Sequence, residues 1–274
     1  MGEVDVTKID KSVGLIGYGA VGAVVGRSLL AGDIAGMSLT GVFDPAGKAP
    51  AHLLVPGLSE LIAGADVIVE AAGPVALRSV VRPVLDAGRT LVALSLGAFL
   101  SEDLYPVLGE AKSGTLILST GALGGIDMVR AVGLTGSAVT VRLTSRKKPR
   151  SLIQPWMTAD HQQRLTELRG SDPAELIFSG TPMDAVRLFP ANLNVAAALA
   201  IAVGDPDAVT VLLIADPATE LTTHEVLVES DFGTSSFTIS NRPDPGNPGT
   251  SAITPWSVIR CLHDLSPRAD TRYC

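Results

Sequence analysis

The chain has 274 residues, of which 46% are hydrophobic and only 4% aromatic, and its formal net charge is −7. This length allows one large domain or two modest ones, and small apolar residues suit helices lying close on a sheet. The negative charge argues against a nucleic-acid-binding surface, because phosphate backbones require clustered Lys and Arg. No apolar run is long enough to span a bilayer without Gly, Pro or charge, so we expect no membrane partner.

The cysteines and the N-terminal segment indicate which cellular compartment to expect. Cys261 and Cys274 have neither the spacing of a disulfide framework nor that of a metal site. The first twelve residues are polar and lack the apolar stretch of a signal peptide. We therefore expect a cytoplasmic protein without a bound metal. The one basic run, Arg146 to Arg150, is either a solvated loop or lies beside an anionic ligand.

The first half of the chain alternates short apolar runs with helical patterns. Strands are expected at 13–16, 38–43, 67–70, 90–94 and 115–118, and helices at 20–30, 58–63, 75–87 and 102–112. This alternation is typical of right-handed βαβ units around a parallel sheet. The strands are apolar throughout, as burial on both faces requires. We therefore expect an α/β fold with a Rossmann-type doubly wound parallel sheet.

The pattern changes after about Gly125. β-rich segments are expected at 138–145, 209–215, 224–228 and 235–240, with an Ala-rich helix at about 195–202. Residues 146–175 are polar and irregular and could hold a helix or a mobile flap. A turn cluster at 241–249 leads to a last helix at about 255–262, which could pack back on the first domain.

These patterns predict two domains and a tail. The expected limits are a dinucleotide-binding domain at 1–125, completed by a C-terminal helix at 250–265, a second α+β domain on an open mixed sheet at 126–249, and a frayed tail at 266–274. The second domain is expected to carry the substrate site and the oligomer contacts.

The motif Gly17-x-Gly19-x-x-Gly22 follows the first expected strand and opens the first expected helix. In a dinucleotide-binding loop the first glycine permits a tight turn, the second lets backbone approach a pyrophosphate, and the third lets helix and strand lie close. The helix N-terminus, with Ala20 and Val21, offers free N–H groups to the phosphates. A glycine turn without a ligand is the alternative, but strand, loop, helix and following acid in register favour the cofactor site.

An acidic residue, Asp44, ends the second expected strand. It is placed to bond both ribose hydroxyls of NAD, and it would repel the 2′-phosphate of NADP. Lys48 lies four residues further on and could neutralise such a phosphate. The expected cofactor is NAD or NADP, with NAD favoured.

Two further loops follow strands in the first half, Glu70-Ala71-Ala72-Gly73-Pro74 and Ser95-Leu96-Gly97-Ala98. In a doubly wound sheet such loops line the ligand crevice. Small residues there, Ala72 among them, would let a nicotinamide ribose lie against the backbone. Ordinary strand-to-helix turns explain the same composition equally well.

Among four histidines, His224 differs because it begins an apolar run, whereas His52 and His161 lie in polar loops and His263 lies near the C-terminus. A histidine at the mouth of a strand could act as a general acid or base. A surface or hydrogen-bonded structural histidine is the alternative.

Two asparagines, Asn192 and Asn194, flank the start of the Ala-rich helix. Helix capping explains at least one of them, because asparagine is a preferred N-cap residue. The second could donate a hydrogen bond to a ligand amide or carboxylate.

Further segments complete an ordered set of motifs. They are Val69–Ala72, Leu94–Ala98, Gly121-Ala122-Leu123-Gly124-Gly125-Ile126-Asp127, Arg146-Lys147, Phe189-Pro190-Ala191-Asn192-Leu193-Asn194, Ala215–Pro217, His224–Val226, Phe232-Gly233 and Asn247–Ser251. With the glycine loop, this order resembles the L-aspartate dehydrogenase family over most of the chain. The Gly121–Asp127 and Phe189–Asn194 segments are the most specific.

The resemblance implies a reaction and roles for particular residues. It implies reversible oxidative deamination of L-aspartate to iminoaspartate, then oxaloacetate and ammonia, with NAD or NADP. It implies that His224 is the active-site histidine and that Ala122 and Asn194 contact the cofactor. Arg146 or Lys147 would hold a substrate carboxylate, with Asn192 also at the substrate. Iminoaspartate made by such enzymes commonly enters NAD biosynthesis.

The chain also departs from the family pattern. Thr222 replaces the asparagine of the usual Asn-x-His, Ser119-Thr120 replaces Pro-Ser, and Lys148 stands where a proline is usual. A related NAD(P)-dependent dehydrogenase or reductase acting on another small amino acid or dicarboxylate is therefore one alternative. A non-catalytic NAD(H)-binding sensor is the other. We expect a homo-oligomer, with a dimer favoured.

Overall fold

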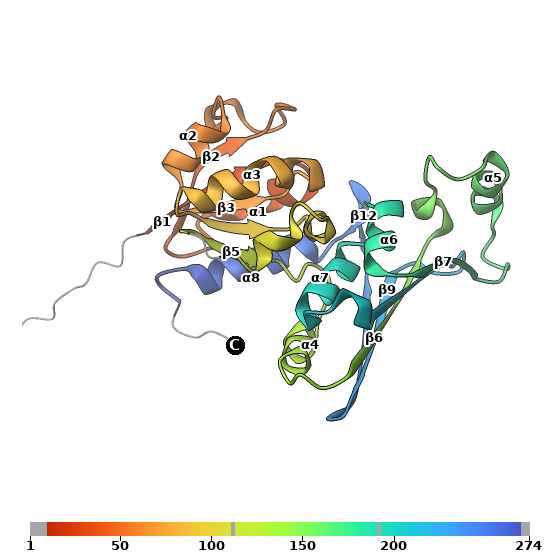
Figure 1. The fold of residues 1–274 in the computed structure, drawn as a ribbon. Helices are drawn as coiled ribbons and strands as arrows, with labels where there is room; N and C mark the ends of the chain where they lie inside the picture. Colours follow the sequence, from red (N-terminus) through yellow and green to blue (C-terminus); the bar gives the residue numbers. More distant parts are fainter. Residues whose placement is uncertain (1–9, 111–112, 191–192, 270–274) are drawn as a thin grey trace, which may run out of the picture. The chain divides into compact units, whose positions relative to one another are not determined.

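The computed structural model describes residues 10–110, 113–190 and 193–269 (Figure 1). The chain forms two compact units. Unit 1 contains the residues up to Ser95, residues 110–119 and the residues from Pro255 onward, and unit 2 contains residues 96–109 and 120–254. The limits expected from the sequence, at 125 and 249, differ from these because residues 96–109, 120–125 and 250–254 belong to unit 2.

Unit 1 is built on a five-stranded parallel sheet. Its strands are β1 (Lys11–Ile16), β2 (Met37–Phe43), β3 (Val67–Glu70), β4 (Thr90–Ala93) and β5 (Thr115–Leu118). Their order is β2-β1-β3-β4-β5, so the chain moves outward from β1 first to one side and then to the other. This confirms the predicted Rossmann-type sheet, and it places β1 at the point where the strand order reverses.

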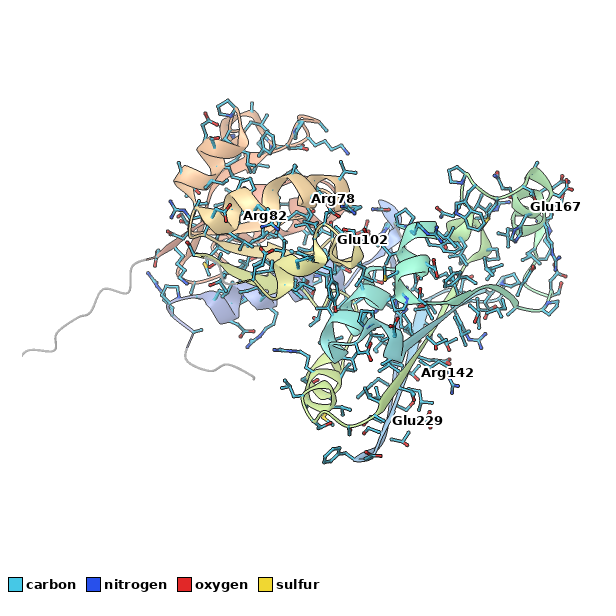
Figure 2. The ribbon with its side chains drawn as sticks, viewed as in Figure 1. Arg78, Arg82, Glu102, Arg142, Glu167 and Glu229 are labelled. Atoms are coloured by element: carbon cyan, nitrogen blue, oxygen red, sulfur yellow. The ribbon has the colours of Figure 1, made fainter. Side chains whose placement is uncertain are left out.

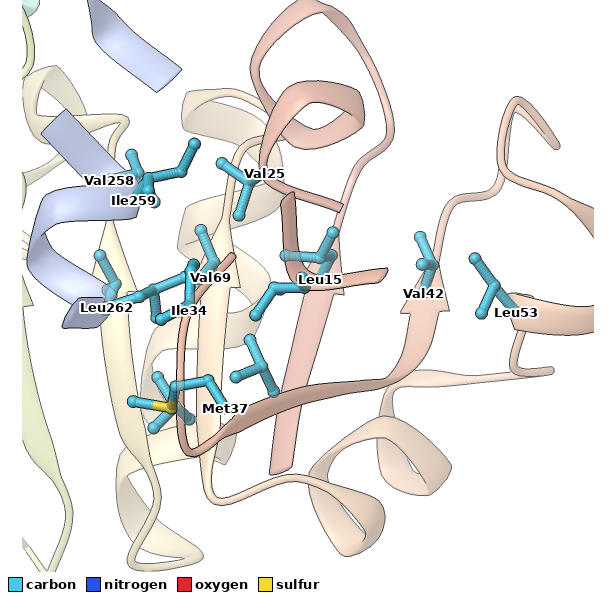
Figure 3. Packing of buried hydrophobic residues seen from close by; sticks show 14 of the residues in the cluster. Leu15, Val25, Ile34, Met37, Val42, Leu53, Val69, Val258, Ile259 and Leu262 are labelled. Carbon is cyan, nitrogen blue, oxygen red and sulfur yellow. The ribbon is translucent and has the colours of Figure 1, made fainter. Parts of the chain in front are cut away.

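Helices cover this sheet, and one of them comes from the far end of the chain. They are α1 (Ala20–Ala31), α2 (Leu58–Gly64), α3 (Pro74–Asp86) and α8 (Thr254–Leu265), with a short 3-10 turn η1 (Ala51–Leu53). Val258, Ile259 and Leu262 of α8 pack in one buried cluster with Val25 of α1 and Val69 of β3 (Figure 3). Each such side chain contributes about 1.5–3 kcal/mol when fully buried, so α8 is part of the unit 1 core.

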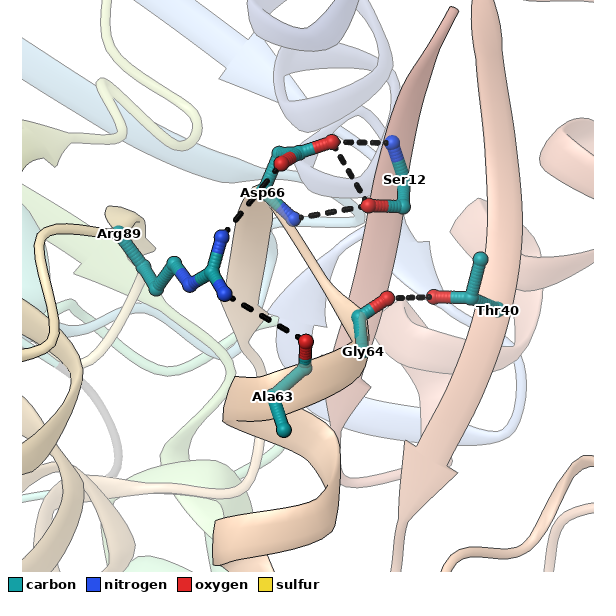
Figure 4. Close-up of polar contacts among 6 residues, drawn as sticks. All are labelled: Ser12, Thr40, Ala63, Gly64, Asp66 and Arg89. Carbon is teal, nitrogen blue, oxygen red and sulfur yellow. Dashed lines mark hydrogen bonds and ion pairs between the residues drawn. The ribbon is translucent and has the colours of Figure 1, made fainter.

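A polar clamp joins β1 and β3 at the ends where these strands begin (Figure 4). The Asp66 carboxylate accepts the backbone N–H of Ser12 at 2.9 Å and its hydroxyl at 2.7 Å, and Arg89 lies 3.5 Å away. These hydrogen bonds from Ser12, and then the Arg89 charge, hold the pKa of Asp66 below its usual value. The clamp fixes the register of β1 and β3 at their N-terminal ends, and the glycine loop lies at the other end of β1.

The predicted helix at 102–112 is wrong over its described residues. A short 3-10 helix, η3 (Tyr105–Leu108), lies within this region instead, and a second one, η2 (Leu96–Leu100), precedes it. Pro106 has no backbone N–H to donate, and Gly109 follows η3 at once, so a longer helix has no support here.

Unit 2 is built on a mixed five-stranded sheet. Its strands are β6 (Val139–Lys147), β7 (Glu175–Gly180), β8 (Val209–Ala215), β9 (Thr222–Ser230) and β10 (Gly233–Asn241), in the order β10-β9-β6-β8-β7. Only the β6–β8 pair is parallel. This confirms the predicted mixed sheet. The predicted turn cluster forms a small hairpin of β11 (Pro243–Asp244) and β12 (Asn247–Ser251).

The helices of unit 2 are α4 (Ile126–Gly133), α5 (Ala159–Glu167), α6 (Pro182–Leu188) and α7 (Asn194–Val203), with 3-10 turns η4 (Pro149–Leu152) and η5 (Pro206–Ala208). Two of these helices, α4 and α6, pack on the Ala-rich helix α7, and α5 packs on η4 instead. Gly133 at the end of α4 lets this helix approach the end of α7 closely, since a Cβ on Gly133 would lie 2.3 Å from the Val203 carbonyl oxygen. Over the described ranges, none of these helices or those of unit 1 has the length and apolarity to cross a membrane.

Candidate functional site

The loop after β1 requires glycine at two of its three motif positions. Gly17 has φ +87° and donates its N–H to the Phe43 carbonyl at 2.9 Å, and a Cβ there would lie 2.9 Å from Ala72. A Cβ on Gly22 would lie 2.2 Å from the Gly17 carbonyl oxygen. The tight turn therefore packs against both the loop after β3 and the first turn of α1.

Gly19 differs from these two glycines, because a Cβ added to it would meet no atom within 4 Å. Gly19 is the N-cap of α1. Within the part of the chain that the structure describes, no side chain caps this helix end, and no acidic residue lies in its first turn. The N–H groups of the first turn, from Ala20 onward, have no intrahelical acceptor, and the helix dipole is positive here. The open space at Gly19 and this helix end fit a pyrophosphate.

Asp44 follows β2 directly, on the same edge of the sheet. Its carboxylate accepts the backbone N–H of Lys48 at 2.7 Å, and its carbonyl accepts that of Gly47 at 2.9 Å. The turn after β2 is therefore closed by Asp44 itself, which stays half-buried. A carboxylate so placed can accept both hydroxyls of an adenosine ribose.

The loops after β3 and β4 are held by a buried carboxylate, that of Glu70. It accepts hydrogen bonds from the backbone N–H groups of Ala72, Gly73 and Ser95 and from the Ser95 hydroxyl. Burial raises the pKa of Glu70 above its usual value, although the four hydrogen bonds act in the opposite direction and lower it. Because the Ala72 N–H is used in this way, Ala72 can meet a cofactor only through its side chain or carbonyl group.

In unit 2, His224 lies on the buried face of the sheet. The strands β6 and β9 pair with Ser145 directly opposite His224, and the Ser145 Oγ lies 2.8 Å from the His224 Nδ1. Ser145 is fully buried and His224 is 2% exposed. Burial and the charge of Lys147 lower the pKa of His224 to about 3, so the imidazole is neutral near pH 7.

The structure separates the two cations that the sequence placed together. Lys147 follows Ser145 by two residues and therefore lies on the same buried face, where burial lowers its pKa to about 8. Arg146 lies on the opposite face, partly exposed and 3.8 Å from the Glu225 carboxylate. Only Lys147 shares the sheet face of His224.

The predicted loop residues of unit 2 have specific partners. The Asn194 Oδ1 accepts the N–H of Gly97 at 3.1 Å, at the start of α7. Ala122 is held by its carbonyl, which accepts a hydrogen bond from the Asn241 side chain at 3.2 Å. Thr222, the departure from the family pattern, lies opposite Asn241 in the β9–β10 pair. Asn192 lies outside the described residues.

Three of these partners are missing from the sequence-based prediction of the site. Ser145 and Asn241 are found only through the strand register, and short-range patterns give no signal for them. Glu70 lies at the start of a predicted loop. An acidic residue at the end of an apolar strand is a signal that its carboxylate accepts hydrogen bonds from the loop that follows. In the described part of the chain, no three His, Cys, Asp or Glu side chains are grouped as metal ligands.

The parallel sheet, the glycine loop and the acid after β2 define the class of protein, a nicotinamide-dependent oxidoreductase. The family model described as "Aspartate dehydrogenase, C-terminal" matches residues 127–265, and "Homoserine dehydrogenase, NAD binding domain" matches residues 17–115. The chain belongs to the L-aspartate dehydrogenase family, and it is an amino-acid dehydrogenase.

Relatives and solved structures agree with this assignment. The L-aspartate dehydrogenase 3 of Bordetella bronchiseptica is 36% identical over 93% of this chain and 94% of its own length. The L-aspartate dehydrogenase of Nitrosopumilus maritimus is 31% identical over 92% and 95%. The crystal structure of aspartate dehydrogenase from Thermotoga maritima has a TM-score of 0.72 at 23% identity, covering 96% of this chain and 99% of that one. The resemblance stated from the motifs is thus confirmed.

Proposed function

We propose that this enzyme interconverts L-aspartate and oxaloacetate with release or uptake of ammonia, through iminoaspartate, and that it prefers NAD to NADP. The observation that carries the proposal is the buried face of the second sheet, where a neutral imidazole and an amine, His224 and Lys147, lie together. A dicarboxylic amino acid offers a carboxylate to the amine and a reacting carbon to the imidazole.

The residues of unit 1 fit the cofactor. The end of α1 and Gly19 would hold the pyrophosphate, and Asp44 would hold the adenosine ribose. When bound, the nicotinamide supplies hydride transfer to and from the substrate α-carbon. The contribution of the protein is to hold and orient that ring and to shield the reaction from competing water.

In the deamination direction, Lys147 would bind a substrate carboxylate and His224 would handle protons. Water attacks the α-carbon of the iminium, and the imidazole takes the proton that this water loses. The same proton then passes to the nitrogen of the carbinolamine. As the C–N bond breaks and ammonia leaves, the hydroxyl group gives its proton to the imidazole and becomes the carbonyl group of oxaloacetate. Ser145 keeps the ring in place through Nδ1, which leaves Nε2 for the substrate.

A bound substrate would relieve one of the two causes of the low His224 pKa. The pKa of His224 is about 3, owing first to burial and then to the Lys147 charge. A substrate carboxylate bound to Lys147 neutralises that charge, so proton uptake by the imidazole becomes easier once substrate is present, while burial still opposes it.

Replacing Lys147 by methionine is expected to raise the KM for aspartate about 10- to 100-fold, because a charged hydrogen bond contributes roughly 1.5–3 kcal/mol. Since the pKa of Lys147 is about 8, the wild-type KM should rise as the pH increases through 8, and that of the variant should not. Lys148→Met is the matched control, because Lys148 is exposed and paired with Glu220. Equal KM values for the wild type and Lys147→Met would contradict the role of this amine.

Replacing Asp44 by serine is expected to raise kcat/KM for NADPH about tenfold or more and to lower it for NADH. Serine removes the negative charge that would face a 2′-phosphate, and a close charge pair near a surface is worth several kcal/mol. Steady-state kinetics with both cofactors measure the change, and Asp33→Ser, at an exposed site of the same unit, is the control. An unchanged cofactor preference in Asp44→Ser would argue against this ribose contact.

The experiment that tests the function is a panel of amino and keto acids assayed with NADH and NADPH. Oxaloacetate with ammonia, and L-aspartate in the other direction, should give the highest kcat/KM. Turnover of another small amino acid or dicarboxylate in their place would identify a related dehydrogenase and point to Thr222 as a change of specificity. NADH binding without turnover on any compound would identify a sensor.

The outward face of the second sheet supports the expected homodimer. Arg142 and Arg146 of β6 and Glu229 of β9 lie on the face opposite to His224, as does the exposed Leu176 of β7. Arg142 and Glu229 are labelled in Figure 2. A face with both charge signs and apolar groups can pair with its own copy across a two-fold axis. Light scattering after gel filtration is expected to give twice the chain mass, and Leu176→Glu should shift it toward the monomer. A wild-type monomer would refute this assembly.

A further inference from the structure

We propose that Glu70 is a positioning residue, which holds the two loops against which the nicotinamide half of the cofactor lies. The inference rests on the cofactor binding proposed above and goes beyond it, because it assigns a role to a residue that does not itself touch the adenosine or the pyrophosphate.

The Glu70 side chain is fully buried at the end of β3, where it accepts hydrogen bonds from two loops. Its Oε1 accepts the N–H of Ala72 at 2.9 Å, the N–H of Gly73 at 2.8 Å and the hydroxyl of Ser95 at 2.9 Å. Its Oε2 accepts the N–H of Ser95 at 3.1 Å and, more weakly, that of Leu94 at 3.4 Å. One carboxylate therefore fixes both the loop after β3 and the loop after β4.

These contacts favour the ionised form of Glu70. The five hydrogen bonds all run toward the carboxylate, and four of them come from backbone N–H groups that cannot accept a proton in return. Burial opposes ionisation, so the charge on Glu70 depends on the hydrogen bonds that the loops donate. The conformation of the loops in turn depends on that charge. Removing the charge without changing the shape should loosen the loops, because an amide would direct its NH₂ group at these donors.

The strand order shows which part of the cofactor these loops would meet. The pyrophosphate belongs at the end of β1, and Asp44 at the end of β2 marks the adenosine side. In the order β2-β1-β3-β4-β5, the other half of a dinucleotide therefore extends over the ends of β3 and β4. Glu70 and its partners lie at the ends of these two strands.

The test is to measure the affinity of two ligands for the Glu70→Gln variant of the full chain. NADH contains both halves of the dinucleotide, whereas ADP-ribose lacks the nicotinamide ring. We expect the Kd for NADH to rise about tenfold or more and the Kd for ADP-ribose to stay within about twofold of the wild type. Calorimetry gives both values without any turnover.

Two further variants make the result specific. Ser95→Ala removes one hydroxyl donor and keeps the backbone contacts, so it should shift the Kd for NADH in the same direction but less. Asp44→Ser should weaken both ligands alike. If Glu70→Gln fails to fold, Glu70→Asp, which keeps the charge but shortens the reach, is tested with the same two ligands and the same expectation.

Each outcome decides the inference. Equal loss of both ligands in the Glu70 variant, or no loss of either, would overturn the positioning role. Failure of the wild type to bind NADH and ADP-ribose would instead overturn the proposed cofactor site, so the two failures are distinguishable.

Discussion

Replacing His224 by alanine is expected to lower kcat about 10²- to 10⁴-fold while the Kd for NADH changes little. The imidazole is the proton-transfer group of the proposed mechanism, and positioned acid–base catalysis contributes a factor of this size. The glycine loop and Asp44 lie in unit 1 and His224 lies in unit 2, so loss of the ring leaves these cofactor residues unchanged. Stopped-flow turnover and NADH fluorescence titration measure the two quantities.

Neighbouring variants separate this role from a structural one. Glu225→Ala, at the next position of β9 and on the opposite face, should keep its turnover. Ser145→Ala should lower kcat less than His224→Ala, because it frees the ring without removing it. A His224→Ala variant with nearly normal kcat would show that another group moves the protons.

Replacing Gly19 by alanine is expected to raise the Kd for NADH about 10- to 100-fold without lowering the Tm. The added methyl group meets no protein atom within 4 Å, so the free protein folds as before. The same methyl group occupies the space that a pyrophosphate needs beside the helix end, and overpacking of this kind costs roughly 1–3 kcal/mol. Thermal unfolding and NADH titration provide the two measurements.

Two other glycines make the comparison sharper. Gly64→Ala adds a methyl group to equally open space in α2, so both the Kd and the Tm should stay near the wild-type values. Gly22→Ala would place its Cβ 2.2 Å from the Gly17 carbonyl oxygen, so it should lower the Tm as well as the affinity. Normal NADH affinity in Gly19→Ala would argue against a pyrophosphate at this position.

The parallel sheet could be predicted because its signals are local. Each strand of unit 1 is a short apolar run, and the glycine spacing, the helix start and Asp44 follow one another within one βαβ unit. The helix expected at 102–112 shows the limit of the same reasoning, since the sequence pattern predicts a helix there that Pro106 and Gly109 do not support. The strand β7 and the helices α4 and α6 are short, and the sequence pattern did not identify them.

The candidate site was harder to predict, because it depends on which strands pair and in what register. Arg146 and Lys147 are consecutive on a strand, so alternation alone requires that they face opposite sides. Ser145 becomes a partner of His224 only through the register of β6 and β9, which short-range patterns do not give. Glu70 could be seen as an acid in a loop, but its hydrogen bonds to the Ser95 loop required the neighbouring strand.

The helix α8 has a consequence for the order in which the chain folds during synthesis. All five strands of the first sheet leave the ribosome early. The buried cluster beside this sheet is completed only when Val258, Ile259 and Leu262 of α8 have been synthesised. Residues 120–254 take roughly 7 to 27 seconds to synthesise at ~5–20 residues per second. During that interval the apolar surface around Val25 and Ile34 lacks its cover, while unit 2 can already form. We therefore expect this protein to need a chaperone most during the interval in which the first sheet has formed and α8 has not yet been made.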